Sequence, residues 1–205
     1  MPERPTLEFF FDCSSPWTYL AFEDVESLAA EAHAELVWKP ILVGGVFNAI
    51  NTSVYEQRAN PIPSKLRYYA KDLQDWARRA GIRIGSPAVF PVNSVKAMRG
   101  CFLALDADVL PAFARGVFEA YWGELRDISQ DEVLLPIVEA CGLDPEQFFE
   151  SIASPPIKQR LRDNTEELIA RGGFGSPTLF VDGDDMYFGN DRLLLARDAL
   201  LRARS

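Results

Sequence analysis

A Ser-Pro pair near the N-terminus has the residue types and spacing to bind and activate an anionic sulfur. Ser15-Pro16 follows a run of strand-forming residues that ends at Phe11, and helical spacing of apolar residues begins directly after it. A helix N-terminus offers unpaired N–H groups and about half a positive charge, which favours a thiolate. A serine hydroxyl there can donate a hydrogen bond to the same sulfur. Ser15 is therefore a candidate thiol-activating residue, although a lone Ser-Pro pair more often caps a helix.

A second Ser-Pro pair, Ser176-Pro177, could bind an extended peptide. It follows a glycine-rich stretch and directly precedes a predicted strand. X-Pro bonds are cis in only about 5% of cases in folded proteins, yet cis prolines concentrate in tight turns. The alternative is a trans proline that begins an edge strand. We predict that Pro177 is cis, that Ser15 faces it, and that Ser176 presents its backbone to a short peptide as in β-strand addition.

The elements at the two ends of the chain must bring these corners together. Thr6–Phe11 and Glu35–Pro40 are predicted parallel strands joined by the helix that begins at Ser15-Pro16. Near the C-terminus, Thr178–Asp182 and Met186–Phe188 are predicted to form a hairpin. A last helix over Asp191–Arg204, capped by Asn190, follows the hairpin.

The middle of the chain is predicted to be helical after one long loop. Gly44–Ser64 is polar and irregular, which indicates a loop. The helices expected after it are Lys65–Gly81, Ser94–Asp106, Leu110–Trp122, Asp131–Cys141, Pro145–Ile152 and Ile157–Arg171. The fold class is thus α/β, a thioredoxin-like fold (βαβ … ββα) with a large all-helical insertion. We assign residues 1–50 and 172–205 to the thioredoxin-like domain and residues 51–171 to the helical insertion domain.

Composition excludes several classes of function. The 205 residues carry a net charge of −9, so nucleic acid is not an expected partner. No stretch approaches the roughly 20 apolar residues of a membrane span, and the N-terminus lacks a signal-peptide pattern, so we expect a cytoplasmic protein without membrane contact. Cys13, Cys101 and Cys141 form no CxxC pair and are expected to stay reduced. With His33 as the sole histidine, we expect no metal site.

Taken in order, these stretches resemble the family of 2-hydroxychromene-2-carboxylate isomerases, which is related to kappa-class glutathione transferases and to DsbA-like disulfide oxidoreductases. The resemblance spans nearly the whole chain. The stretches that carry it are Phe11-Asp12, Ser15–Leu20, Lys39–Leu42, Gly45, Phe90–Ser94, Ala97–Gly100, Gly173–Thr178 and Phe188–Arg192. Where the oxidoreductases have Cys-x-x-Cys, this chain has Ser15-Pro16-Trp17-Thr18, and Cys13 has no second sulfur nearby. Dithiol exchange is therefore the weaker hypothesis.

The resemblance implies glutathione as the cofactor and assigns roles to individual residues. Ser15 would contact the glutathione sulfur as the catalytic residue. Independently of the resemblance, Trp17 is the aromatic residue that we expect to line a pocket for an aromatic substrate, although aromatics at helical spacing are more often part of the core. The implied glutathione-binding residues are Asn51, Lys65, Ser176, Pro177, Asn190 and Asp191. Asn51 fits the family pattern with a one-residue shift, and the family more often has Ser at position 190. Homodimers are common in the family, so a second copy of the chain is an expected partner.

The implied activity is an isomerisation in the degradation of naphthalene-type compounds. The glutathione thiolate would add to a conjugated enone acid, allow rotation about the resulting single bond, and then leave. The family reaction interconverts 2-hydroxychromene-2-carboxylate and trans-o-hydroxybenzylidenepyruvate. Two alternatives stay open from the sequence: a kappa-type glutathione transferase or peroxidase, and a non-catalytic thioredoxin-like module that binds peptides. Failure to bind glutathione would favour the last.

Overall fold

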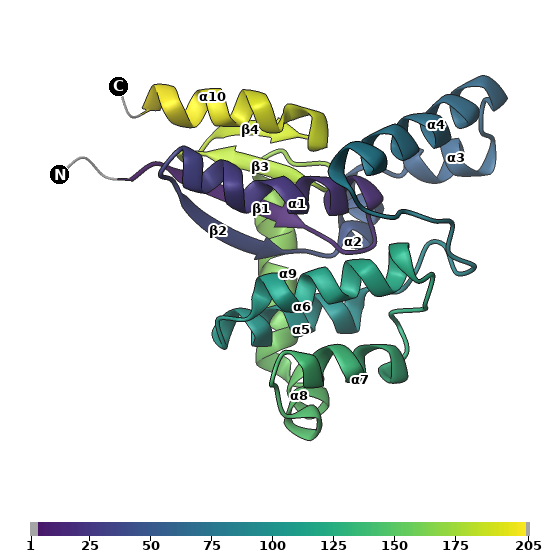
Figure 1. Ribbon diagram of the computed structural model, residues 1–205, viewed down its shortest axis with the longest axis vertical. Coiled ribbons are helices and arrows are strands. Elements are labelled where there is room, and N and C mark those ends of the chain that lie inside the picture. The colour runs from purple at the N-terminus through teal and green to yellow at the C-terminus, as the bar shows by residue number, and fades with distance from the viewer. Residues whose placement is uncertain (1–3, 204–205) are drawn as a thin grey trace.

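A four-stranded sheet joins the two ends of the chain in the computed structural model, which describes residues 4–203 (Figure 1). The strand order is β2-β1-β3-β4. β1 (Thr6–Phe11) pairs in parallel with β2 (Glu35–Pro40) and antiparallel with β3 (Thr178–Val181). β3 continues into a hairpin with β4 (Asp185–Phe188). The predicted parallel start and the predicted hairpin are both confirmed.

Helices cover both faces of this sheet. α1 (Pro16–Glu31) and α10 (Leu193–Ala203) pack on one face, and α9 (Pro155–Ala170) crosses the other (Figure 1). Side chains alternate between the two faces along a strand. Phe9 of β1 accordingly lies in the larger core, whereas Phe10 lies in a second cluster with Leu168 of α9. Because both faces of β1 are covered at its end, apolar residues continue without alternation from Phe9 to Phe11.

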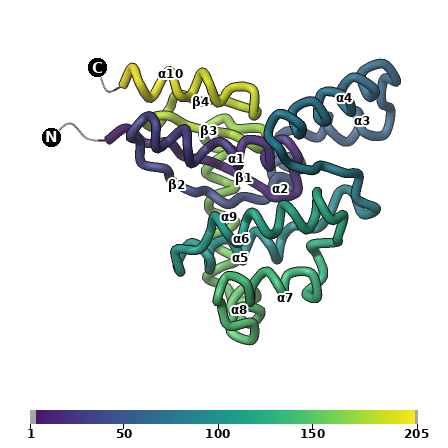
Figure 2. Tube along the Cα trace, viewed as in Figure 1, coloured from purple at the N-terminus to yellow at the C-terminus, as the bar shows by residue number. Residues whose placement is uncertain are grey.

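All regular elements that the structure describes between β2 and β3 are helices. They are α2 (Val43–Ile50), α3 (Ser53–Ala59), α4 (Pro63–Ala80), α5 (Val95–Asp106), α6 (Leu110–Phe118), a π-helical turn (Glu119–Gly123), α7 (Asp131–Ala140), α8 (Pro145–Ile152) and α9. Figure 2 shows α3 and α4 projecting together from the sheet as one arm, while α5 to α8 gather below it. This arrangement confirms the predicted thioredoxin-like fold with a helical insertion.

The predicted loop over Gly44–Ser64 is wrong, because this segment contains α2 and α3. The first turn of a helix has unpaired N–H groups, and here the Val43 N–H donates to the buried Asp12 carboxylate at 2.8 Å. Asn51 and Asn60, two of the polar residues in this segment, follow the ends of the two helices as their C-caps. The stabilising partner of α2 is distant in sequence, so local composition could not reveal it.

The end of the chain also differs from the prediction in one detail. Asn190 does not cap the last helix, because it begins a 3₁₀ turn (Asn190–Arg192) that precedes α10. No side-chain capping hydrogen bond is made there. Residue 204, where the predicted helix ends, lies outside the described residues.

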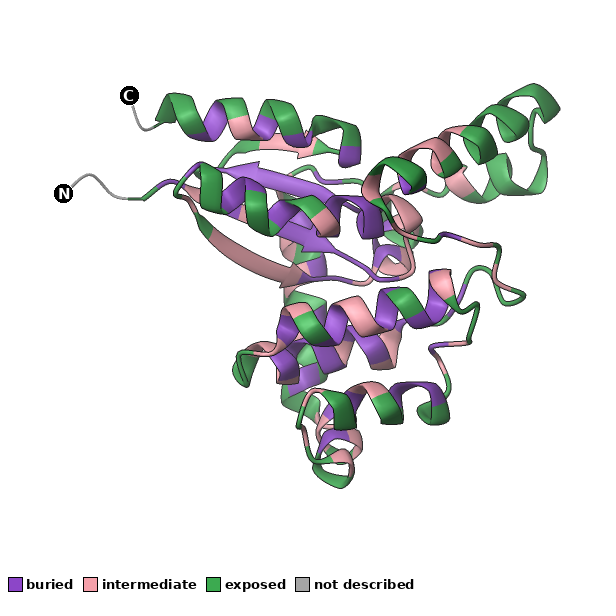
Figure 3. Cartoon of the chain, viewed as in Figure 1, coloured by how far each residue is buried: buried purple, intermediate pink, exposed green. Residues whose placement is uncertain are grey.

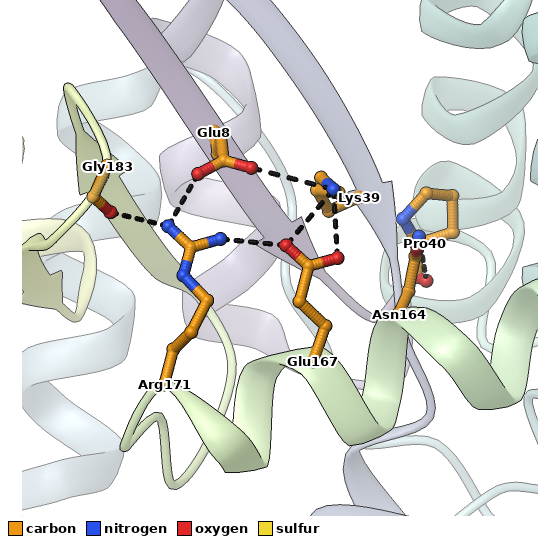
Figure 4. A network of polar contacts seen from close by, with 7 residues as sticks. All are labelled: Glu8, Lys39, Pro40, Asn164, Glu167, Arg171 and Gly183. Atoms are coloured by element: carbon orange, nitrogen blue, oxygen red, sulfur yellow. Dashed lines mark hydrogen bonds and ion pairs between the residues drawn. The ribbon is translucent and has the colours of Figure 1, made fainter.

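An ion-pair network attaches α9 to the sheet (Figure 4). Arg171, which directly follows α9, contacts Glu8 of β1 at 2.5 Å and Glu167 of α9 at 2.8 Å. Lys39 of β2 binds the same Glu167 at 2.9 Å. Arg171 also donates to the Gly183 carbonyl in the β3–β4 turn. The proposed domain boundary at residue 171 thus lies at the end of α9, a helix assigned to the insertion domain that packs on the sheet. The division into domains stays a proposal.

Buried residues lie mainly in the sheet and where helices pack against one another (Figure 3). Buried residues concentrate in β1 and β3 and on the inner sides of α1, α5 and α6, whereas the α3–α4 arm is mostly exposed (Figure 3). Among residues 4–203, no helix has both the length and the apolar character needed to cross a membrane.

Gly100 of α5 marks a close contact between helices. A Cβ at this position would lie 2.5 Å from the Phe148 ring and 2.8 Å from the Phe113 ring. We expect Gly100→Ala to lower the free energy of unfolding by about 1–3 kcal/mol, because a well-packed core must shift to admit the methyl group. Urea unfolding followed by circular dichroism measures the change.

A glycine in another helix gives the matched control. An added Cβ at Gly44 of α2 would meet nothing within 4 Å. We expect Gly44→Ala to be neutral or to stabilise the protein by up to about 1 kcal/mol, since alanine has the higher helix propensity. Equal effects of the two substitutions on unfolding would contradict the packing argument.

Candidate functional site

The two Ser-Pro corners face each other. Ser15 is the N-cap of α1, and its Oγ accepts a hydrogen bond from the Thr18 N–H at 3.2 Å. The same hydroxyl donates to the Ser176 carbonyl at 3.1 Å. The Ser176-Pro177 peptide bond is cis. The predictions that Pro177 is cis and that Ser15 faces it are therefore confirmed.

The side chain of Ser176 is committed to the interior of this corner. Its hydroxyl accepts the Asp12 N–H at 3.0 Å and lies 2.8 Å from the Thr18 hydroxyl, both in buried hydrogen bonds. These contacts fix the orientation of the peptide unit that Ser176 begins. The Ser176 hydroxyl is therefore already hydrogen-bonded within the protein, and the predicted contact of its backbone with a ligand stays a prediction.

Asp12 is a fully buried carboxylate that joins three segments at the same corner. One oxygen accepts the Ser14 N–H at 2.9 Å. The other accepts the Val43 N–H at 2.8 Å and the Ser94 hydroxyl at 3.1 Å. Burial raises the pKa of Asp12, and hydrogen bonds from these three residues offset part of that rise. The corner after β1, the start of α2 and the start of α5 therefore depend on one carboxylate.

Cys13 is part of the core rather than of the reactive surface. Its side chain is buried, and burial together with a contact to Cys101 raises the pKa of the Cys13 thiol well above its ordinary value. Its carbonyl accepts the Trp122 indole N–H at 3.0 Å. All three cysteines are free, as predicted. Cys13 thus stays a protonated thiol and does not suit disulfide exchange.

A cavity of about 620 Å³ opens beside Ser15. This volume lies in the range of small-molecule sites. Ser15, Trp17 and Ser176, all predicted site residues, line it. Aromatic rings form much of its wall: Trp17, Phe47, Tyr55, Phe90, Phe174 and Phe188. The cavity suits a ligand with an apolar, aromatic part.

Two contacts shape the wall next to the cis proline. Phe174 and Phe188 pack with ring centroids 4.5 Å apart. A Cβ at Gly175 would lie 2.8 Å from the Phe188 ring, so this approach requires glycine. The predicted binding residue Asn51 also lines the cavity, and its amide donates to the Phe174 carbonyl at 3.1 Å. Asn51 therefore holds the wall in place from the start of the arm.

Arg58 is a residue of the site that sequence reasoning missed. It is the one charged side chain among the described residues that line the cavity. Its guanidinium lies 5.6 Å from the centroid of the Phe47 ring and 5.2 Å from that of Phe90. Arg58 belongs to α3, in the segment predicted to be a loop, and no local motif distinguishes it from other surface arginines. It gives the cavity a positive charge.

Four predicted binding residues lie outside the lining of the cavity, and Pro177, next to the lining residue Ser176, is one of them. Lys65 is exposed in the first turn of α4. Asn190 is buried in the 3₁₀ turn, and Asp191 is exposed and paired with Arg192. The Pro177 carbonyl accepts a hydrogen bond from the residue before Asn190, so this turn is tied to the cis-proline corner. The proposed contacts of these four residues with glutathione stay predictions.

Comparisons with known proteins relate the chain to enzymes of similar length. Residues 6–201 match the family described as DSBA-like thioredoxin domain. The chain is 34% identical over 200 residues to a 2-hydroxychromene-2-carboxylate isomerase of Pseudomonas putida, covering 96% of this chain and 94% of the relative. It is 29% identical over 209 residues to glutathione S-transferase kappa 1 of Homo sapiens, covering 95% and 90%.

Solved structures agree with the sequence relatives. A 2-hydroxychromene-2-carboxylate isomerase structure superposes with a TM-score of 0.82 at 31% identity, covering 96% of this chain and 95% of that one. A probable DsbA oxidoreductase from Streptomyces coelicolor superposes with a TM-score of 0.78 at 18% identity, covering 98% and 90%. At that lower identity the second similarity concerns the fold alone.

The hydrogen bonds of Asp12 predict a loss of stability on substitution. In Asp12→Asn an amide NH₂ would face the Val43 N–H or the Ser14 N–H, so at least one donor in the corner would lose its acceptor. We expect a decrease of about 1–3 kcal/mol in the free energy of unfolding at acid pH. Asp24→Asn, at an exposed position of α1, is the control and should change stability by less than about 0.5 kcal/mol.

The raised pKa of Asp12 also fixes how this difference varies with pH. The folded state keeps the proton at pH values where the unfolded chain, with a carboxyl pKa near 3.9, has lost it. The contribution of Asp12 to stability is therefore complete below the unfolded pKa and falls as pH rises through the folded pKa. Unfolding curves between about pH 3.5 and about pH 7 should show the gap between native protein and Asp12→Asn narrowing. A gap that widens would contradict the pKa shift.

Proposed function

This chain belongs to the DSBA-like thioredoxin domain family, in the group of 2-hydroxychromene-2-carboxylate isomerases and kappa-class glutathione transferases, and we propose that it is a glutathione-dependent isomerase. The proposed reaction interconverts 2-hydroxychromene-2-carboxylate and trans-o-hydroxybenzylidenepyruvate. One observation carries the proposal: the Ser15 hydroxyl caps α1 beside an open cavity and faces the Ser176 carbonyl. A hydroxyl in this place, without a dithiol, suits activation of a thiol that the ligand brings.

Glutathione would bind by exchanging one hydrogen bond for another. In the unliganded arrangement the Ser176 carbonyl accepts the Ser15 O–H. The N–H of the cysteinyl unit of glutathione would donate to this carbonyl in place of the Ser15 hydroxyl, as an added β-strand does. The Ser15 O–H would then be free to donate to the glutathione sulfur. The same step would thus bind the peptide and release the activating hydroxyl.

The energy required for this activation is available at the N-terminus of α1. A thiol with a pKa near 8.5 is mostly protonated at neutral pH, and lowering that pKa by about two units requires roughly 2.7 kcal/mol. A hydrogen bond to a charged group contributes about 1.5–3 kcal/mol, and a helix N-terminus adds about 0.3–1 kcal/mol. Together they match the requirement without a neighbouring cation.

The thiolate would then act as a reusable nucleophile. Its sulfur adds to the conjugated carbon–carbon double bond of the enone acid, which becomes a single bond and rotates. Expulsion of the sulfur restores the double bond and returns glutathione, so no oxidant or reductant is consumed. The aromatic part of the substrate would lie between the rings of the cavity wall, where Trp17 is the nearest of them in sequence to Ser15.

The ends of glutathione are proposed to reach residues on both sides of Ser176. Three extended residues span about 10 Å, so a tripeptide bound at its centre extends in two directions. Asn190 and Asp191 would hold the γ-glutamyl amine and carboxylate, with Asp191 supplying the negative charge. Asn51 and Lys65 would meet the glycine carboxylate. The homodimer implied by the resemblance is likewise part of this proposal.

A kappa-type transferase is the second candidate, because the human kappa 1 transferase is 29% identical over 209 residues. The two activities differ in the fate of the sulfur. An isomerase returns glutathione after each turnover, whereas a transferase consumes one molecule for each product. Counting free glutathione during turnover of 2-hydroxychromene-2-carboxylate separates them.

Ser15→Ala tests the activating hydroxyl directly. We expect the thiol of bound glutathione to have a pKa about two units below 8.5 in the native protein. In the variant this pKa should rise by about 1–2 units. The ultraviolet absorbance of the thiolate, followed against pH, measures both values. Ser14→Ala, next to Ser15 in the cavity lining, is the control and should leave the thiol pKa unchanged. Absence of glutathione binding would reject both enzyme proposals and favour the peptide-binding module.

Arg58→Gln tests the positive charge of the cavity. Both forms of the proposed substrate carry a carboxylate, so we expect KM to rise about tenfold while kcat changes little. Arg67→Gln, at an exposed position of α4 outside the cavity lining, is the matched control. Steady-state kinetics at fixed glutathione measures the two constants. An equal increase in KM for both variants would show that Arg58 acts through general charge and not through contact.

A further inference from the structure

A second groove lies between α2, α5 and α9 and has a volume of about 400 Å³. Leu42, Gly45 and Val95 line both this groove and the Ser15 cavity, so the two share a wall. Ser15 and Ser176 do not line the groove. We refer to it as the α5–α9 groove, and its charged lining residues are Arg99, Lys158, Arg162 and Glu166.

Two cations of α9 face this groove without an acidic partner. Among the described residues, neither Lys158 nor Arg162 makes an ion pair, although the chain has a net charge of −9. Arg160, between them in sequence, is paired with Asp106 at 2.5 Å and does not line the groove. The helix thus has one neutralised arginine outside the groove and two uncompensated cations along it.

Arg99 of α5 supplies the third cation and is incompletely hydrogen-bonded. Its Nε is buried and has no partner within the described part of the chain. One terminal nitrogen is 3.5 Å from the Ile152 carbonyl, at the limit of a hydrogen bond. Burial lowers the pKa of Arg99, and no carboxylate opposes that effect. Buried polar groups are nearly always paired, so this donor is left for water or for a group bound in the groove to satisfy.

The rest of the groove is apolar. Leu42, Ala49, Val95, Leu161 and Ile169 form its walls. The Thr165 hydroxyl also lines it, but this group already donates to the Leu161 carbonyl at 2.7 Å and accepts the Leu42 N–H at 3.0 Å. Recognition is therefore divided between cations, which suit an anionic head, and apolar walls, which suit a hydrophobic body.

We propose that the α5–α9 groove binds a small carboxylate with an apolar body, whose head is held by Arg99, Lys158 and Arg162. Glu166 offsets one of these three charges and leaves the groove cationic. The occupant would contact Leu42 and Gly45 at the start of α2, from the side opposite the Ser15 cavity. The site is independent of glutathione, because no residue of the Ser15–Ser176 corner contributes to it.

Benzoate is a suitable probe for a titration of the full chain, saturated with glutathione and followed by ¹H–¹⁵N NMR. We expect saturable shifts of the Ala49, Arg99 and Thr165 amides, which line the groove and not the Ser15 cavity. The double variant Lys158→Gln/Arg162→Gln should weaken benzoate binding at least about tenfold, because charge-assisted contacts are lost. Arg160→Gln, on the same helix but outside the groove, should bind benzoate with unchanged affinity.

Two further probes each lack one feature of benzoate. Benzyl alcohol should bind far more weakly than benzoate, because it lacks the charge, and inorganic phosphate should bind more weakly, because it lacks the apolar body. Equal affinity of benzoate and either probe would overturn the proposed ligand class. Unchanged affinity in the double variant, or shifts confined to Trp17 and Ser176, would overturn the site. Failure of glutathione to bind would reject the proposed enzyme function but would leave these groove measurements interpretable.

Discussion

The buried carboxylate of Asp12 is the interaction on which the rest of the site depends. It has no cation beside it in the described structure, so the three donors from Ser14, Val43 and Ser94 are what offset part of the cost of its burial. Those donors belong to the corner after β1, the first turn of α2 and the residue before α5. Because α2 contributes a wall to both the Ser15 cavity and the α5–α9 groove, a single carboxylate sets the position of both.

The sheet brings the two corners near each other, and hydrogen bonds then fix their orientation. Phe10 of β1 lies opposite Thr178 of β3, which places the segments after Phe11 and before Thr178 at one edge. The Asp12 N–H then donates to the Ser176 hydroxyl across 164 residues of sequence. Strand pairing alone would leave the Ser176 carbonyl free to turn. The buried hydroxyl contacts direct it toward Ser15, where a peptide could take its place.

Local pattern was sufficient for the elements whose own residues carry the signal. The strands, the Ser15 cap and the hairpin were predicted from residues within a few positions of one another, although β1 pairs with strands far away in sequence. α2 was missed because the partner of the Val43 N–H is Asp12, 31 positions away, and α3 was missed with it. Arg58 in α3 was also missed, because its place in the cavity lining depends on the rings of Phe47 and Phe90 and not on its neighbours in sequence. The cis proline and the facing of the two corners needed both the local pattern and the resemblance to a family.

The position of Thr18 explains why this corner suits a ligand's sulfur better than one of its own. In the related oxidoreductases this position carries the second cysteine of the redox pair. Here the Thr18 hydroxyl is buried and lies 2.8 Å from the Ser176 hydroxyl, so this position helps to hold the corner between the two Ser-Pro pairs. Cys13 is also withdrawn into the core, with a thiol pKa raised by burial. Neither Cys13 nor position 18 thus supplies a nucleophilic sulfur at the head of α1, which is consistent with the proposal that the sulfur arrives with a bound peptide.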